Sequence, residues 1–408
     1  MENTIFVQIA SYRDPELNST LTDLLEKAHE PQNLHICIAH QHSKDDEWDN
    51  IPNGIKDSCK FTILDIDYTE SEGACWARNK IQQEYQGEKY TLQLDSHHRF
   101  IEGWDTECID MLVKLQEKGY NKPLLTSYIP SYEPSNDPQG RVNTPWGMNF
   151  DRFTPEGIIF FLPYYIESSV TEPIPARFFS GHFTFTLGEH ARDVQHDPNL
   201  YFHGEEISLA VRSWTHGYDL FHPHKVLAWH EYTRVGRTKQ WDDDPIWGER
   251  NTNAHQRVRT LLGVDGTPCT PCNKNSFGKY FLGEERTLEE WERFAGIRFK
   301  DRSIQPSVTT NQIPMERDEP YNEKFRHPLE FNRHQLTHDD YSFSAIIFEN
   351  EKGEVLFRED ADERTTMSWI TQEHITLWKE YQGPKPYKWI VWPHSKSKGW
   401  VDKIEVVL

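Results

Sequence analysis

The chain has 408 residues and a mass of 48.2 kDa, which exceeds one typical domain and predicts two or three. Its 65 acidic and 44 basic residues give a formal charge of −21, which argues against nucleic acid or an anionic membrane as the partner. Its 14 Trp, 17 Tyr and 22 Phe residues exclude general disorder. So many aromatic rings in a polar chain suit either a protein that handles sugars or an aromatic core.

The sequence predicts no membrane span, because its longest apolar run, residues 157–166, has half of the about 20 residues required. The first residues lack a basic region and a cleavage site and read directly as a strand, so no signal peptide is expected. Six cysteines form no disulfide framework, and we expect reduced thiols in a cytoplasmic protein. A single C-x-x-C pair, Cys269 and Cys272, is weak evidence for zinc.

The first 125 residues alternate between predicted strands and helices. Apolar runs predict strands at residues 2–12, 33–40, 59–68 and 90–97, and helical spacing predicts helices at 17–30, 72–85 and 104–119. Strands separated by helices of this length indicate βαβ units in a mostly parallel sheet. Ligands of such sheets bind at the carboxyl ends of the strands.

The middle of the chain begins with a Pro-, Asn- and Gly-rich stretch at residues 128–149, which predicts a long binding loop or lid. Further strands are predicted at 157–166, 178–187 and 218–230, and a helix at 204–217. In the polar stretch 235–320 only one helix is clear, at 287–296, and we expect this stretch to wrap back onto the first domain.

A change in composition near residue 320 predicts a domain boundary. Residues 303–332 read as a linker, and a hairpin with a turn at Asn350–Gly353 follows it. Two more strands are expected in residues 387–408. The sequence therefore predicts an α/β domain at 1–320 and a small β-rich domain at 321–408, which would hold the acceptor or build a homo-oligomer.

The strongest local signal is Asp95-Ser96-His97 at the end of a predicted strand. Side chains two positions apart in a strand point to the same side, so Asp95 and His97 can converge on one ion. A carboxylate and an imidazole suit Mn²⁺ or another first-row divalent metal. The alternative is a strand end that carries solvated polar side chains.

Three weaker signals accompany it. Residues Gly73 and Ala74 allow close backbone approach at the start of a helix, where anions are favoured, and Arg78 can reach a phosphate; an ordinary capped helix is the alternative. Glu205 and Glu206 begin another helix and suit a base or a hydroxyl-binding role, although acidic residues favour helix starts in any case. His230 follows a predicted strand and can complete the metal site, although a lone His is usually structural.

In this order, these features resemble the hydroxyproline-linked polypeptide N-acetylglucosaminyltransferases, a glycosyltransferase family that uses UDP-GlcNAc. The resemblance spans about residues 4–240, and its most discriminating part is the run D-S-H-x-R-F-x-x-G-W-D. The matching runs are FVQIASYRDPEL, GACWARNKIQQEY, YTLQLDSHHRFIEGWDTECI, FFSGHFTFTLGEHARDV and YFHGEEISLAVRSWTHGYDLFHPHKVLAWHEYTR. His182 departs from the family pattern, which has Gly in S-G-G-x-F.

The resemblance implies a GT-A nucleotide-sugar transferase fold, a Mn²⁺ (or Mg²⁺) cofactor, a UDP-sugar donor and retention at the anomeric carbon. It implies metal binding by Asp95, His97 and His230, and places Glu205 and Glu206 beside the donor sugar and the acceptor hydroxyl. The UDP-sugar contacts that it implies are Ser11, Tyr12, Arg13, Asp67, Arg78, Asp95, Ser96, Gly181 and His182.

Three other functions stay open at this point. An inverting GT-A enzyme of the polysaccharide synthase type would use Glu206 as its base. A non-catalytic nucleotide-sugar-binding protein would keep the fold without the chemistry. A metal hydrolase is disfavoured, because the chain has neither H-E-x-x-H nor H-x-H-x-D.

Overall fold

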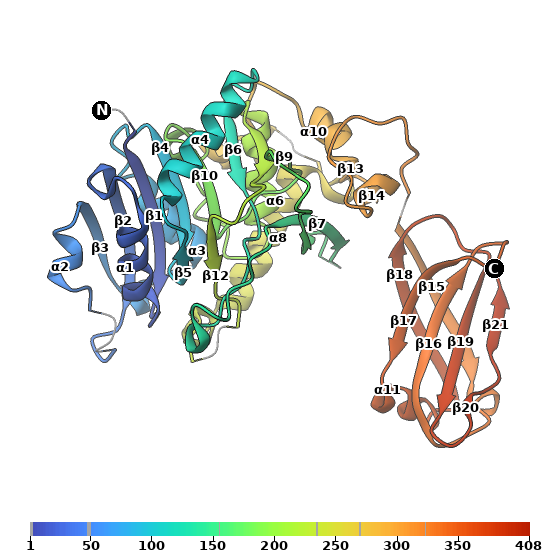
Figure 1. Cartoon of the computed structure of the whole chain (residues 1–408). Helices are drawn as coiled ribbons and strands as arrows, with labels where there is room; N and C mark the ends of the chain where they lie inside the picture. Colours follow the sequence, from blue (N-terminus) through green and yellow to red (C-terminus); the bar gives the residue numbers. More distant parts are fainter. Residues whose placement is uncertain (1–2, 47–49, 155, 234–235, 269–270, 323) are drawn as a thin grey trace. The chain divides into compact units, whose positions relative to one another are not determined.

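A computed structural model of the chain describes residues 3–46, 50–154, 156–233, 236–268, 271–322 and 324–408. The chain forms two compact units, and Figure 1 shows their elements. The first contains Met1–Lys300 and Ser307–Arg317, and the second contains Asp301–Pro306 and Asp318–Leu408. Cys269 and the side chain of Cys272 lie outside the described residues. No helix in the described ranges is long and apolar enough to cross a membrane.

The first unit is built on an eight-stranded sheet with the order β3-β2-β1-β4-β10-β6-β11-β9. Strands β3, β2, β1 and β4 are parallel, as are β6 and β11, whereas β10 runs antiparallel to both of its neighbours. The predicted mostly parallel α/β fold is confirmed. The strands are β1 (Ile5–Tyr12), β2 (Leu34–His42), β3 (Lys60–Asp67), β4 (Tyr90–Asp95), β6 (Pro123–Thr126), β9 (Ile174–Pro175), β10 (Phe183–Leu187) and β11 (Asp219–His222).

Alternating side chains of β1 explain the layers of this unit. Ile5, Val7 and Ile9 pack with α1 and α4 in the main core, whereas Phe6 belongs to a second cluster with Ala77 of α3. Helices therefore cover both faces of the sheet (Figure 1). The helices are α1 (Leu17–Lys27), α2 (Asn53–Lys56), α3 (Ala74–Gln82), α4 (Trp104–Glu117), α5 (His190–Asp193), α6 (Glu205–Thr215), α7 (Gln240–Asp243), α8 (Trp247–Leu262), α9 (Pro271–Phe277) and α10 (Leu288–Ala295).

Two small antiparallel sheets complete the first unit. Strand β5 (His98–Phe100) pairs with β12 (Ala228–His230), and β7 (Trp146–Phe153) pairs with β8 (Ile159–Tyr165). The segment predicted as one strand at 218–230 is thus two strands, β11 and β12, because Pro223 and its neighbours interrupt it. A two-residue strand β13 (Ile297–Arg298) ends this part.

The stretch 235–320 contains more helix than the sequence predicted. Besides α10, it holds α7, α8 and α9, so the expectation of one helix was wrong. The buried apolar residues of α8 begin only at Ala254, since Trp247 at its start is exposed and the residues between them are polar or glycine. Helices α8 and α10 both contact α6.

The second unit is β-rich, as predicted. Its core joins a two-stranded sheet, β15-β18, to a second sheet, β17-β16-β19-β20, with β21 beside β19. Residues 324–332, predicted as linker, form β15, which pairs along its length with β18. The elements are β14 (Ser303–Ile304), β15 (Lys324–Asn332), β16 (Tyr341–Glu349), β17 (Val355–Ala361), α11 (Glu363–Trp369), β18 (His374–Gln382), β19 (Lys388–Ser395), β20 (Gly399–Trp400) and β21 (Ile404–Val407).

Candidate active site

The site forms where parallel strands end. Strands β1 and β4 pair in register up to Ala10 and Asp95, so the residues that follow each strand emerge at the same edge of the sheet. Strand β10 lies antiparallel to β4, with Phe183 opposite Leu94, which brings Gly181 and His182 to the same edge. The pairing of His98 with His230 between β5 and β12 adds a third chain segment.

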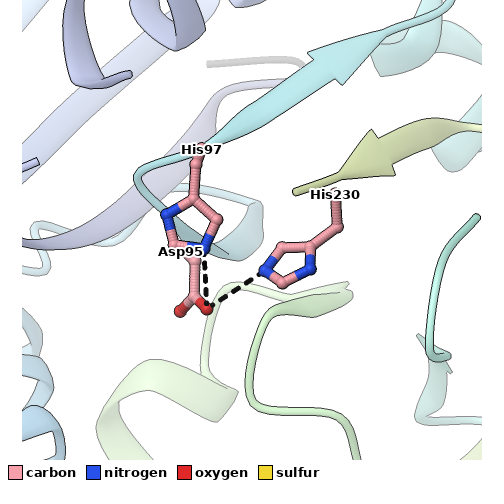
Figure 2. A group of neighbouring side chains, drawn as sticks. All are labelled: Asp95, His97 and His230. Atoms are coloured by element: carbon pink, nitrogen blue, oxygen red, sulfur yellow. Dashed lines mark hydrogen bonds and ion pairs between the residues drawn. The ribbon is translucent and has the colours of Figure 1, made fainter. Parts of the chain in front are cut away.

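Three side chains converge at this edge (Figure 2). Oδ2 of Asp95 lies 3.7 Å from Nε2 of His97 and 3.4 Å from Nε2 of His230. One ligand atom from each residue lies within 4.8 Å of the others, and among the described residues no other group of three His, Cys, Asp or Glu side chains meets this condition. The three residues predicted as metal ligands are therefore brought together.

The residues present fit a divalent cation. Burial lowers the pKa of His230 well below its usual value, so the ring stays neutral, which is the form that binds metals. Its Nε2 faces Asp95, and its buried Nδ1 has no hydrogen-bond partner. One carboxylate and two imidazoles can together hold a first-row divalent cation.

Arg78 is the nearest charge to this carboxylate. Its Nη2 lies 2.6 Å from Oδ1 of Asp95, and its side chain is 5% exposed. Burial raises the pKa of Asp95, but the hydrogen bond with His230 and the charge of Arg78 outweigh it and hold the pKa well below the ordinary value. Asp95 is therefore ionised, and Arg78 contacts the proposed metal ligand instead of lining the cleft described next.

A cleft with an empty volume of about 840 Å³ opens beside the three side chains. The ends of β1 and β4, the start of α3 and a later segment, residues 237–241, surround it. Its walls include Ala10, Tyr12, Asp14, Gln41, Ser71, Gly73, Ala74, Asp95, Ser96, His97, Tyr201, Phe202, His230, Arg237 and Gln240.

Of the predicted UDP-sugar contacts, the N-terminal ones are only partly at this cleft; they are Ser11, Tyr12, Arg13 and Asp67. Tyr12 lines it, and its hydroxyl donates to Asp243 at 2.7 Å. Ser11 is buried, and Arg13 is engaged by Asp46 and Asp243. Asp67 is exposed, accepts a hydrogen bond from the backbone of Thr69 and does not line the cleft. Gln41 and Ser71 occupy the wall instead, and their side chains share a 2.6 Å hydrogen bond.

The segment 236–244, which we call the cover segment, belongs to the stretch that was expected to wrap back onto the first domain, but its place at the cleft was not predicted. Gln240 donates to the backbone oxygen of Ser71 and contacts the hydroxyl of Tyr201, and Trp241 packs on Phe202. Arg237 and Lys239 also line the cleft. Because the protein is strongly acidic, these two cations are a notable local charge for an anionic ligand. The only signal in the sequence was a short basic run.

Asp14 is the second residue that the sequence analysis missed. It is 3% exposed, and its Oδ2 lies 2.7 Å from Nδ1 of His97 and accepts a hydrogen bond from the hydroxyl of Ser96 at 2.6 Å. Nη1 of Arg237 lies 3.1 Å from the same oxygen, and Nη2 of Arg237 lies 2.6 Å from Glu231. Burial raises the pKa of Asp14, but His97 and Arg237 outweigh it and lower the pKa below its ordinary value.

Glu205 and Glu206 begin α6 close to the strand end but outside the cleft wall. Glu206 accepts from the backbone N–H of Gly181 at 2.8 Å and from the hydroxyl of Tyr128 at 2.9 Å. Burial raises the pKa of both carboxyls, the two groups oppose each other's ionisation, and Arg78 lowers both values only in part. Both carboxyls therefore lose their protons at a higher pH than an exposed glutamate does.

His182 packs between the Asp95–His97–His230 cluster and this acidic pair. Its ring stacks on His230 with centroids 4.3 Å apart and on Tyr128 at 5.2 Å. Its Nε2 accepts from the backbone N–H of Ile129 at 3.3 Å. Gly181 and His182 thus support the site from behind, because neither lines the cleft.

Comparison with known proteins identifies a family. The sequence profile of the family described as Glycosyltransferase (GlcNAc) matches residues 4–57 and 52–301, more than half of the chain. A search of curated proteins finds no match.

Solved structures show weaker likenesses. GalNAc-T7, solved with UDP, GalNAc and Mn²⁺, has 16% identity and a TM-score of 0.47 over 71% of this chain. This chain spans 54% of the GalNAc-T7 chain. TarS from S. aureus has 10% identity and a TM-score of 0.39, covering 99% of this chain and 85% of TarS. The mannosyltransferase PcManGT from Pyrobaculum calidifontis has 11% identity and a TM-score of 0.37, covering 67% of this chain and 74% of PcManGT.

Proposed function

The chain belongs to the glycosyltransferase family described as Glycosyltransferase (GlcNAc), and we propose that it moves N-acetylglucosamine from UDP-GlcNAc to a hydroxyl group of a protein or glycan. The proposed reaction needs a divalent cation, Mn²⁺ before Mg²⁺, and retains the configuration at the anomeric carbon. The observation that carries the proposal is the convergence of Asp95, His97 and His230 on one wall of the cleft.

Each part of the cleft has a task in this reaction. Asp95, His97 and His230 would hold the cation, which when bound neutralises charge on the diphosphate leaving group. Arg237 and Lys239 of the cover segment also line the cleft; Asp14 and Glu231 engage Arg237, whereas Lys239 is 36% exposed and can approach a diphosphate. Gly73 and Ala74 open the wall at the start of α3, so the backbone N–H groups of this helix end can approach an anion.

The roles of Glu205 and Glu206 bear on whether the reaction retains or inverts the configuration at the anomeric carbon. Both oxygens of Glu206 already accept hydrogen bonds, from Gly181 and Tyr128, which supports a positioning role and a retaining reaction without a protein base. The raised pKa of Glu206 instead favours the inverting alternative, in which this carboxylate takes the proton of the acceptor hydroxyl. Proton NMR of the fresh product separates the two courses by the anomeric configuration.

The test of the function is release of UDP from a panel of UDP-sugars, in Mn²⁺ and in EDTA. We expect slow hydrolysis of UDP-GlcNAc that EDTA abolishes and that Asp95→Ala loses. The matched control is Asp193→Ala, which removes a partly exposed carboxylate paired with Arg192 outside the cleft and should leave the rate unchanged. Preference for another UDP-sugar would correct the donor.

A negative result also discriminates. If no donor releases UDP but calorimetry detects Mn²⁺-dependent UDP binding that Asp95→Ala weakens, the chain is a nucleotide-sugar-binding protein, unless an acceptor restores turnover. If neither UDP nor Mn²⁺ binds, the proposed function is wrong.

A further inference from the structure

The imidazole of His97 has two possible neutral tautomers, and only one can serve a cation. Nε2 faces Asp95, and Nδ1 faces away from it toward Asp14. When the proton is on Nδ1, the lone pair of Nε2 is free on the side of Asp95 and His230. When the proton is on Nε2, it points toward Asp95 and blocks that side.

Two neighbours compete for Nδ1 of His97. Oδ2 of Asp14 lies 2.7 Å away and can only accept a hydrogen bond while it is ionised, which requires the proton on Nδ1. The guanidinium of Arg237 also contacts Nδ1, and it can only donate, which would require Nδ1 to be bare. Asp14 therefore favours the tautomer that frees Nε2, and Arg237 favours the other.

The surroundings of Asp14 hold its carboxylate in place. Its Oδ1 accepts from the backbone N–H of Glu16 at 2.9 Å, at the start of α1, and Oδ2 accepts from the hydroxyl of Ser96 at 2.6 Å. The turn that leads into α1 explains the position of Oδ1 alone. Oδ2 is turned the other way, toward His97, and also pairs with Arg237 at 3.1 Å, so the carboxylate draws the guanidinium to itself as well.

We propose that Asp14 is a positioning residue that fixes the tautomer and ring orientation of His97, so that Nε2 of His97 faces Asp95 and His230. This inference rests on the proposed function, because it assumes that the three side chains hold a cation. Carboxylates that hydrogen-bond the far nitrogen of a metal-binding histidine have this effect in general, and their loss costs roughly 10- to 100-fold in metal affinity.

The test measures binding of Mn²⁺ alone by calorimetry, without nucleotide. Asp14→Asn keeps the size of the side chain but removes its charge, so the amide can donate to Nδ1 and favour the blocking tautomer. We expect Mn²⁺ affinity to fall about 10- to 100-fold. Ring ¹⁵N shifts of histidine-labelled, metal-free protein supply the second readout: the signal lost in His97→Asn should change from the Nδ1–H to the Nε2–H form in Asp14→Asn.

The chain offers a matched control in Glu88, a buried carboxylate that lies 2.5 Å from Nδ1 of His35, outside the cleft. Glu88→Gln makes the same chemical change at another buried carboxylate–imidazole pair and should leave Mn²⁺ affinity unchanged. A second variant, Arg237→Met, removes the competing donor while keeping Asp14. Arg237→Met removes the ion pair between Arg237 and Asp14, and it also removes the donor that favours the blocking tautomer of His97. It should therefore bind Mn²⁺ at least as tightly as the parent chain.

The outcomes separate this inference from the function on which it rests. If the parent chain does not bind Mn²⁺, the metal site itself is wrong. If the parent binds and Asp14→Asn binds equally well, or keeps the Nδ1–H signal, the role of Asp14 is overturned. If Glu88→Gln or Arg237→Met loses as much affinity as Asp14→Asn, the loss reflects general destabilisation, and the inference also fails.

Discussion

Nη2 of Arg78 lies 2.6 Å from Oδ1 of Asp95, so the carboxylate at the centre of the site already has one cationic partner. The other oxygen of Asp95 faces His97 and His230. The two oxygens thus divide their tasks between a fixed arginine and the proposed metal. Arg78 lies on α3 and Asp95 ends β4, so this pair also ties the helix to the sheet edge.

Removal of the guanidinium should destabilise the chain and change its response to metal. Arg78→Met leaves Asp95 without its partner, and loss of one member of a buried pair costs about 3–5 kcal/mol. Because the Asp95 side chain is 29% exposed, we expect the lower end, about 3 kcal/mol. Urea unfolding in EDTA measures this change.

Added Mn²⁺ should then raise the melting temperature of Arg78→Met more than that of the parent chain, because the cation replaces the missing positive charge. The control is Arg192→Met. The side chain of Arg192 is 63% exposed, and its partner Asp193 is also at the surface. It should cost less than about 1 kcal/mol. Equal losses in both variants would contradict a buried role for Arg78.

Stability should depend on pH through Glu205 and Glu206. Burial raises the pKa of both groups in the folded chain. From the ordinary glutamate pKa up to the raised value, the folded chain binds more protons than the unfolded chain, so the unfolding free energy falls as pH rises. Below the ordinary pKa both states are protonated and this contribution is constant.

Thermal melts of metal-free protein between pH 5 and pH 8.5 measure this slope. Buried histidines such as His190 and His222, whose pKa burial lowers to about 3 and about 4, contribute the opposite slope up to their ordinary pKa. The informative quantity is therefore the difference between parent and variant. Glu205→Gln should remove part of the fall in stability with pH, whereas Glu102→Gln, with an exposed side chain, should not.

The sequence could indicate that Asp95 and His97 lie together, but it could not indicate that Asp14 contacts His97. The sequence placed Asp95 and His97 two positions apart in one strand, whereas β4 ends at Asp95 and His97 lies in the bend before β5, so their closeness in the chain brings both residues to the strand end. Asp14, by contrast, lies 83 residues before His97 and reads as an acidic loop residue at the start of a helix. Only the register of β1 against β4 brings the two together.

The errors in the fold also have physical causes. Residues 324–332 read as linker because Pro328 interrupts the apolar pattern, but among the described residues β15 pairs with β18 alone, and the other side of such an edge strand tolerates proline. Helix α8 was missed because its buried residues are few and lie late in the helix. Contacts made with α6 stabilise it where its own pattern is weak.

Gly73 should be sensitive to a single methyl group. Its φ is +107°, and a Cβ there would lie 2.8 Å from the ring of Tyr201 and 2.9 Å from the backbone oxygen of Tyr201. Since Gly73 and Tyr201 both line the cleft, Gly73→Ala should move the wall and weaken UDP binding, besides costing about 1–3 kcal/mol in backbone strain.

Gly87→Ala is the matched control, because Gly87 has a φ of +92° and no heavy atom within 4 Å of the added Cβ. It carries the conformational cost without the collision. Urea unfolding and UDP calorimetry of both variants separate the two effects. A UDP affinity that falls equally in both would show that the approach to Tyr201 has no part in binding.

The β-rich unit should be dispensable for donor chemistry and required for acceptor use or assembly. Every proposed metal and cleft residue lies within Met1–Lys300, whose core is separate from that of the second unit. The second unit exposes large apolar side chains, with Val355 at 56%, Trp378 at 58% and Val407 at 58%. These residues lie on β17, β18 and β21, so they are separate surface positions at which a contact with an acceptor or another chain can be tested.

Deletion of residues 325–408 tests this division. We expect the truncated chain to keep Mn²⁺-dependent hydrolysis of its UDP-sugar. We also expect one of two losses: either the mass measured by light scattering falls by more than the mass of the deleted residues, or acceptor-stimulated UDP release disappears. A full-length chain with Trp378→Ser and Val355→Ser controls for misfolding of the truncated product. If acceptor turnover and assembly size both stay unchanged after the deletion, the β-rich unit neither binds the acceptor nor holds copies of the chain together.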